Sequence, residues 1–158
     1  MQGMDNQKGA TLLEILGVVA IIALLLVIVV TPLSPYRDTQ ALNADALAVQ
    51  SLLSEARSQT LSSLDGSEYG VHFESDRAVL FQGFTFSEPS AYNKEVNLHP
   101  RLSISTIDIN GGGSNIIFAR LTGEATSTYG TTTISLISDT TKKREIVTSQ
   151  SGIVSQSQ

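Results

Sequence analysis

The side chains that could carry out chemistry are few in this sequence, and their spacing does not favour catalysis. His72 and His99 are its only histidines, and neither belongs to a spaced metal-binding motif. Glu74 and Asp76 fall where a turn between two strands would keep both carboxylates solvated, so we expect an ordinary pKa for Glu74. Cysteine is absent, which excludes thiolate zinc sites and cysteine nucleophiles. We therefore expect no enzymatic activity and no cofactor, and we identify no metal site.

One acidic residue, Glu14, lies at the start of a long apolar segment. No side chain from Ile15 to Val30 is polar. As a helix, Ala10–Val30 would be roughly 30 Å long at about 1.5 Å per residue, which matches the hydrocarbon core of a bilayer. A charge at mid-membrane costs about 2.5–3.5 kcal/mol on insertion scales, so such residues tend to be functional. A shallow Glu14 could instead reach the lipid headgroups.

Three interpretations compete for residues 1–35. A secretory signal peptide has an apolar stretch of roughly 7–15 residues and then a small-x-small cleavage site. Here the apolar run is longer, and Thr31–Arg37 contains no such site. An ordinary membrane anchor fits the length but leaves Glu14 unexplained. The third interpretation is a prepilin-type leader followed by its helix.

The residues around Glu14 resemble the processing site of type IV prepilins. The stretch Lys8–Leu16 reads K-G-A-T-L-L-E-I-L, and it is similar to the family's basic residue and glycine followed by a Phe-Thr-Leu-Ile-Glu-Leu-like start. The main departure is Ala10, where the family usually has phenylalanine. The positions that match directly are Gly9, Thr11, Leu12 and Glu14.

This resemblance implies a specific maturation. A prepilin peptidase would cut between Gly9 and Ala10 on the cytoplasmic face and N-methylate the new amino group of Ala10. Glu14 would become the fifth residue of the processed chain, where the family's carboxylate pairs with the N-terminal amine of a neighbouring subunit. Opposite charges attract strongly at low dielectric, whereas either alone is costly there.

The resemblance also implies partners and a location. The partners are a prepilin peptidase, other pilin or pseudopilin subunits contacted through the N-terminal helix, and the membrane before assembly. The chain would cross the bacterial inner membrane once, with its head on the exported side, and then enter a pilus or pseudopilus. Lys8 agrees with a cytoplasmic N-terminus.

The elements that must position these residues divide the chain into three parts. We expect a leader over 1–9, an N-terminal helix over 10–64 and a β-rich head over 65–158. The helix would be transmembrane over 10–33 and amphipathic over 37–64, with a kink at Pro32 and Pro35, and Asp65-Gly66 is a plausible stop. The residues of this helix that would face the head form one stripe, spaced three and four positions apart: Leu42, Ala46, Val49, Leu53, Ala56, Thr60 and Leu64.

After Gly66 the pattern changes to short segments rich in β-branched and aromatic residues. Alternation within 102–109 is too weak to tell which face is inside. Asn110–Ser114 is a hairpin or loop signal. The expected fold class is α+β, a long N-terminal helix packed on an antiparallel sheet. The expected strands are 69–73, 78–81, 102–109, 115–119, 131–137 and 145–148.

Two short patterns in the head resemble the GspH/FimT branch of pseudopilins and minor pilins. Ile116-Ile117-Phe118 followed by Gly123 is similar to that branch's Ile-x-Phe…Gly pattern. Residues 144–148 followed by Ser151-Gly152-Ile153 are similar to its last strand and terminal glycine.

The densest basic run is Lys142-Lys143-Arg144, between two expected strands. A net charge of −5 argues against a general nucleic-acid binder. Some FimT-type minor pilins are DNA receptors, so this run could contact DNA, although a solvated turn is the commoner explanation. Two hypotheses result: a non-catalytic minor subunit of a type II secretion pseudopilus or type IV pilus, and a pilus-tip binding module such as a DNA-uptake receptor.

Overall fold

The computed structural model describes residues 11–30, 33–125 and 127–157 of the chain. They form two compact units, one within residues 1–37 and one over Asp38–Gln158. The expected leader and the Gly9–Ala10 bond lie outside the described residues, as does the expected kink position Pro32.

The first unit contains helix α1, Leu12–Val30. Every residue from Leu12 to Leu26 is exposed, with Leu12 at 81% and Leu24 still at 64%. The expected transmembrane segment, 10–33, includes residues 10, 31 and 32, which are not described. Among the described residues, no helix is both long enough and apolar enough to cross a membrane.

Helix α2 spans Leu33–Leu61, and most of its expected apolar stripe is buried. Leu52 is buried as well, although it was not part of the expected stripe. Leu64 was expected to be buried, and this expectation is wrong because Leu64 is 45% exposed. The helix ends three residues before the expected boundary. Ser63 takes a left-handed conformation (φ 50°), and a short 3₁₀ turn follows over Leu64–Gly66. Buried stripe residues are Leu42, Ala46, Val49, Leu53, Ala56 and Thr60.

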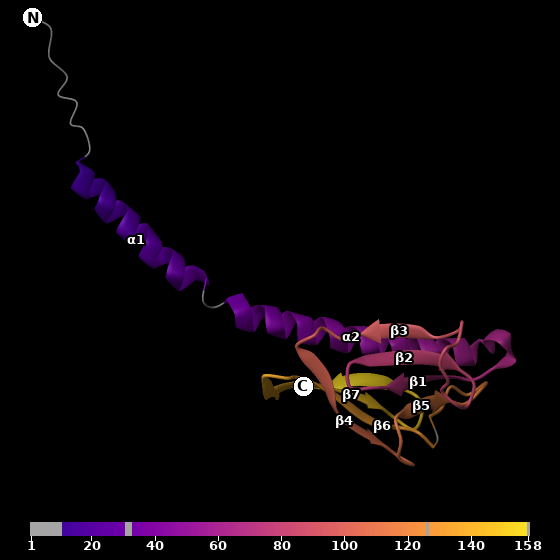
Figure 1. Cartoon of the computed structure of the whole chain (residues 1–158). Coiled ribbons are helices and arrows are strands. Elements are labelled where there is room, and N and C mark those ends of the chain that lie inside the picture. Colours follow the sequence, from indigo (N-terminus) through magenta and orange to yellow (C-terminus); the bar gives the residue numbers. More distant parts are fainter. Residues whose placement is uncertain (1–10, 31–32, 126, 158) are drawn as a thin grey trace, which may run out of the picture. The chain divides into compact units, whose positions relative to one another are not determined.

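The head contains two four-stranded antiparallel sheets beside α2 (Figure 1). The first has the order β3-β2-β1-β5, and the second has the order β4-β6-β7-β8. This arrangement confirms the expected α+β class. The strands of the first sheet are β1 (Tyr69–Phe73), β2 (Arg77–Gln82), β3 (Lys94–Asn97) and β5 (Asn115–Phe118). Those of the second are β4 (Leu102–Ile109), β6 (Gly130–Leu136), β7 (Asp139–Thr148) and β8 (Val154–Ser157).

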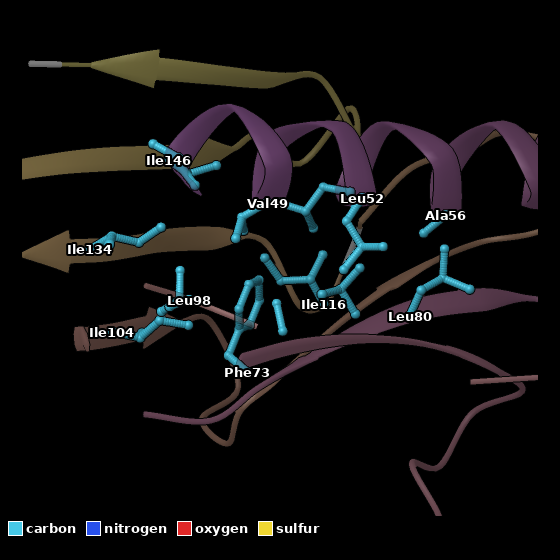
Figure 2. Packing of buried hydrophobic residues seen from close by; sticks show 14 of the residues in the cluster. Val49, Leu52, Ala56, Phe73, Leu80, Leu98, Ile104, Ile116, Ile134 and Ile146 are labelled. Atoms are coloured by element: carbon cyan, nitrogen blue, oxygen red, sulfur yellow. The ribbon is translucent and has the colours of Figure 1, made fainter. Parts of the chain in front are cut away.

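One hydrophobic core joins α2 to both sheets (Figure 2). Val49 and Ala56 of α2 are fully buried in it. The first sheet contributes Ile116 and the second contributes Ile134, both also fully buried. Since each of the three layers buries one apolar face against the others, the head has the packing of a domain with its own core.

Two of the edge strands and the start of β7 differ from expectation. Strands β3 and β8 were not expected, and β7 begins at Asp139 rather than at residue 145. Of the two interpretations left open for Asn110–Ser114, a hairpin or a loop, the loop holds, because the segment connects β4 and β5, which belong to different sheets.

Candidate assembly site

Glu14 lies in the first turn of α1 and is exposed to solvent. Its backbone N–H donates to the carbonyl oxygen of Thr11 at 3.0 Å and to the Thr11 hydroxyl at 3.3 Å. A carboxylate in the first turn interacts favourably with the partial positive charge at a helix N-terminus. Glu14 therefore stands at the end of α1 where a carboxylate is favourably placed.

The rest of the described part of α1 offers only apolar surface. Between Ile15 and Leu26 its residues are aliphatic apart from Gly17, and all are exposed. A helix that is hydrophobic on all sides is typically covered, either by lipid or by other helices. Such surroundings would also desolvate Glu14, whose carboxylate would then require a cationic partner. The arrangement suits an element that associates with other chains.

The expected processing site is not part of the described structure. Gly9 and Ala10 lie outside the described residues, so cleavage after Gly9 and methylation of Ala10 stay predictions. Thr11, the first described residue, precedes the helix, and its carbonyl oxygen accepts the N–H of Ile15 at 3.2 Å.

The basic run does not lie in a turn between strands, as we expected, but inside β7. Side chains alternate along a strand, so Lys143 faces away from Lys142 and Arg144. Lys143 Nζ pairs with Glu145 at 2.7 Å, and Arg144 Nε donates to the Asn43 side chain of α2 at 3.0 Å. The three cations therefore do not form one surface, and two of them have partners within the head.

The two histidines are held by structural contacts. The His72 ring stacks on Phe86 with 4.0 Å between ring centroids, and His72 Nδ1 lies 2.6 Å from the Asn115 amide oxygen. The His99 backbone N–H donates to the Asp45 carboxylate at 2.6 Å. Within the described ranges, no three His, Asp or Glu side chains come together in a way that could hold a metal ion.

The expectation of an ordinary pKa for Glu74 is wrong. Arg77 donates two hydrogen bonds to this carboxylate, at 2.9 and 3.1 Å, and these lower the pKa of Glu74. The same guanidinium also contacts Glu88 at 3.0 Å and Glu95 at 3.3 Å. Arg77 therefore ties β2 to β3 and to the segment between them. Sequence spacing alone did not reveal this cluster because Glu88 and Glu95 are distant along the chain.

We expect Glu74→Gln to destabilise the head most at neutral pH. The folded-state pKa of Glu74 lies below its ordinary value of 4.5, so the carboxylate stabilises the fold above that pH. This contribution is lost as the pH falls through the folded-state pKa. Urea unfolding of residues 38–158 should give a difference between wild type and variant that is largest above about pH 5 and shrinks on acidification.

The exposed Glu124 provides the matched control. Glu124→Gln also removes one carboxylate from the head, and it should change the unfolding midpoint little at any pH. A Glu74→Gln difference that stays constant from acidic to neutral pH would contradict the proposed role of the Arg77 contact.

Sequence reasoning missed Arg57, which joins two of the short patterns noted above. Its Nε donates to the Gly123 carbonyl oxygen at 3.0 Å, and its Nη2 donates to the Ser151 carbonyl oxygen at 3.5 Å. Gly152 adopts φ +77°, and a Cβ added there would collide with the Gly123 carbonyl oxygen. The two glycines singled out by the GspH/FimT resemblance therefore meet at one junction, beside α2.

Comparison with known proteins supports the description of the N-terminal segment and of the fold. Residues 4–30 match the family model for the prokaryotic N-terminal methylation motif. None of the curated proteins matches the sequence. Among solved structures, the minor pseudopilin EpsH of the Vibrio cholerae type 2 secretion system has a TM-score of 0.53 at 15% identity, covering 73% of this chain and 95% of EpsH. The type IV minor pilin FimU of Pseudomonas aeruginosa has a TM-score of 0.57 at 15% identity, covering 78% of this chain and 93% of FimU.

At this level of identity the structural likeness establishes the fold. The expected prepilin-type N-terminal motif and the expected pilin-like fold are both confirmed. The neighbours are a minor pseudopilin and a minor pilin, the two classes that the GspH/FimT resemblance named.

Proposed function

We propose that this chain is a non-catalytic minor subunit of a type II secretion pseudopilus or a type IV pilus. In this proposal it is processed between Gly9 and Ala10, N-methylated on Ala10 and assembled through its N-terminal helix. The observation that carries the proposal is the position of Glu14. It is an exposed carboxylate in the first turn of a helix whose described side chains are otherwise aliphatic and exposed, within a methylation motif.

Assembly through α1 explains why so much apolar surface is exposed on a chain that already has a complete core. The head buries its own hydrophobic residues between α2 and two sheets. The side chains of α1 from Leu12 to Leu26 are not part of that core. Neighbouring subunits would cover these side chains, and a neighbour's N-terminal amine would pair with Glu14.

Before assembly, the same segment would hold the protein in the inner membrane. The absence of polar side chains from Ile15 to Val30 supports this location. The head would lie on the exported side, and the subunit would then enter the filament. The proposed partners are a prepilin peptidase and other pilin or pseudopilin subunits. Because one solved neighbour comes from a secretion system and the other is a type IV minor pilin, the fold does not choose between these systems.

Co-expression with a prepilin peptidase, followed by mass analysis of the N-terminus, tests the proposal. The expected product starts at Ala10 and carries one methyl group on its amine. The leader offers a matched pair of glycines, Gly3 and Gly9. Gly9→Leu should block cleavage, because a side chain there obstructs approach to the scissile bond, whereas Gly3→Leu should be processed normally. A wild-type chain that keeps Met1 would refute the proposed function.

A further inference from the structure

The strands at the edges of the two described sheets are β3, β5, β4 and β8. An edge strand presents backbone N–H and C=O groups that are available to another chain, and natural proteins protect such edges with charges, bulges or covering segments. Two of these edges have such a protection within the strand itself. Strand β3 exposes the charged side chains of Lys94 and Glu95, and β4 has a bulge between Ile104 and Thr106.

The edge of β5 is covered by a side chain. The Thr128 hydroxyl accepts the backbone N–H of Ile117 at 2.8 Å, and it donates to the Ile117 carbonyl oxygen at 3.1 Å. One hydroxyl therefore satisfies both backbone groups of Ile117, as a neighbouring strand would. Another chain would have to displace Thr128 before it could pair with β5.

Strand β8 has none of these protections. Its residues, Val154–Ser157, are uncharged and include no proline, and their register with β7 is uninterrupted. Within the part of the chain that the structure describes, β7 is the only strand beside it. Of the four edges, β8 is therefore the one that is open to another strand.

The hydrogen bonds between β7 and β8 show which groups of β8 point outward. The Ser149 N–H donates to the Ile153 carbonyl oxygen at 2.9 Å. Because bonded pairs alternate in an antiparallel ladder, the N–H and C=O groups of Val154 and Gln156 point away from β7. Two exposed apolar side chains, Leu47 and Ile153, line the hollows between α2 and this strand. A partner that pairs with β8 would cover them as well.

We propose that β8 docks against β8 of a second copy of this chain, antiparallel and about a twofold axis. Pairing Val154 with Gln156 of the second copy uses every outward backbone group of both strands, and it places the two Ser155 residues opposite each other on the axis. Charge favours this occupant. Two uncharged strands place no like charges opposite each other, whereas a charged segment would find no opposite charge on β8. The two sheets would become one continuous sheet.

Disulfide formation tests this register, because the chain has no cysteine of its own. The two Ser155 residues would form a non-hydrogen-bonded pair with Cα atoms about 4.5 Å apart, within the range of a disulfide. Ser157 is the matched control, since it is also exposed and lies on the same face. Its two copies would be four residues out of register, about 13 Å apart at roughly 3.3 Å per residue.

The experiment uses cells that express the full chain and are treated with a mild oxidant. We expect Ser155→Cys to form covalent dimers at least about tenfold faster than Ser157→Cys, because Cα atoms more than about 7 Å apart cannot be bridged without backbone movement. The product should have twice the mass of the chain.

A proline at position 156 tests the backbone pairing itself. The Gln156 N–H points away from β7, so Gln156→Pro removes a donor toward the second copy and none toward β7. Added to Ser155→Cys, it should lower crosslinking to the level of Ser157→Cys. Gln156→Ala keeps the N–H, so the same cysteine chain with this change should crosslink as fast as Ser155→Cys alone.

The contrary outcomes are distinct. Equal crosslinking of Ser155→Cys and Ser157→Cys, or none by either, overturns the inference. Crosslinking that persists at full rate with Gln156→Pro also overturns it, because the strands would not be paired through their backbones. A Ser155→Cys product of another mass would identify a different chain as the occupant. None of these results depends on leader cleavage or on Glu14, so the proposed function is tested separately.

Discussion

Replacing Glu14 with valine is expected to leave the protein in the membrane and to exclude nearly all of it from filaments. Valine suits the apolar surroundings of α1, so insertion does not suffer. The neighbouring subunit's amine, however, would be buried without its partner, and an unpaired buried charge costs about 3–5 kcal/mol. That penalty corresponds to a loss of recruitment of more than about a hundredfold. Crosslinking between subunits in sheared filaments measures recruitment directly.

Two controls separate charge from size and from general destabilisation. Glu14→Gln keeps the length of the side chain but removes its charge, so it should fail almost as severely as Glu14→Val. Glu124→Gln removes an exposed carboxylate from the head and should be incorporated normally. Normal incorporation of Glu14→Val would defeat the proposed pairing with a neighbour's amine.

The elements with strong periodicity could be predicted from the sequence. The buried stripe of α2 followed steps of three and four from Leu42 to Thr60, because one face of this helix packs on the core. Strand β1 was predicted with its observed bounds, Tyr69–Phe73. It is a central strand, and its buried Tyr69, Val71 and Phe73 are of the aromatic and β-branched types that favour strands. The sequence pattern is strong where one face of an element is buried along its whole length.

The sequence of β4 did not show which of its faces is buried, and the structure gives a specific reason. The register with β6 shifts between Ile104 and Thr106, which indicates a bulge at this point. Before the shift the buried positions are Leu102 and Ile104, and after it Ile107 and Ile109 lie against the core. A bulge inserts one residue and so reverses the side-chain phase. No single alternating pattern could therefore describe the whole strand.

Two edge strands, β3 and β8, and the long-range contacts were missed because they leave little local signal. Strand β8 is mostly polar, and it is held by backbone pairing with β7 on one side only. The bond from Arg57 to Gly123 joins positions 66 residues apart, so no local spacing could reveal it. For the candidate assembly site the limit was different. Glu14 was identified from a motif, whereas the hydrogen bond from the Glu14 N–H to the Thr11 hydroxyl depends on the local backbone geometry, which no motif specifies.

The junction of Arg57, Gly123 and Gly152 leads to the largest expected effect on stability. In Gly152→Ala the new methyl group would meet the Gly123 carbonyl oxygen and lie 2.9 Å from Arg57 Nε. The left-handed conformation costs about 1–2 kcal/mol for an L-residue, and overpacking adds about 1–3 kcal/mol. Displacing the carbonyl would also break its hydrogen bond from Arg57. We expect a loss of about 3–4 kcal/mol in the unfolding free energy of residues 38–158.

Gly112→Ala separates backbone strain from collision. Gly112 has nearly the same backbone angle, φ +78°, but a Cβ added there has no neighbouring atom within 4 Å. This variant should therefore lose only the conformational part, about 1–2 kcal/mol. Guanidinium unfolding curves of the two variants measure the difference. Equal losses would show that Gly152 is required for its backbone angle alone. A larger loss at Gly152 would show that α2, the Gly123 loop and the C-terminal segment must pack too closely there for any side chain.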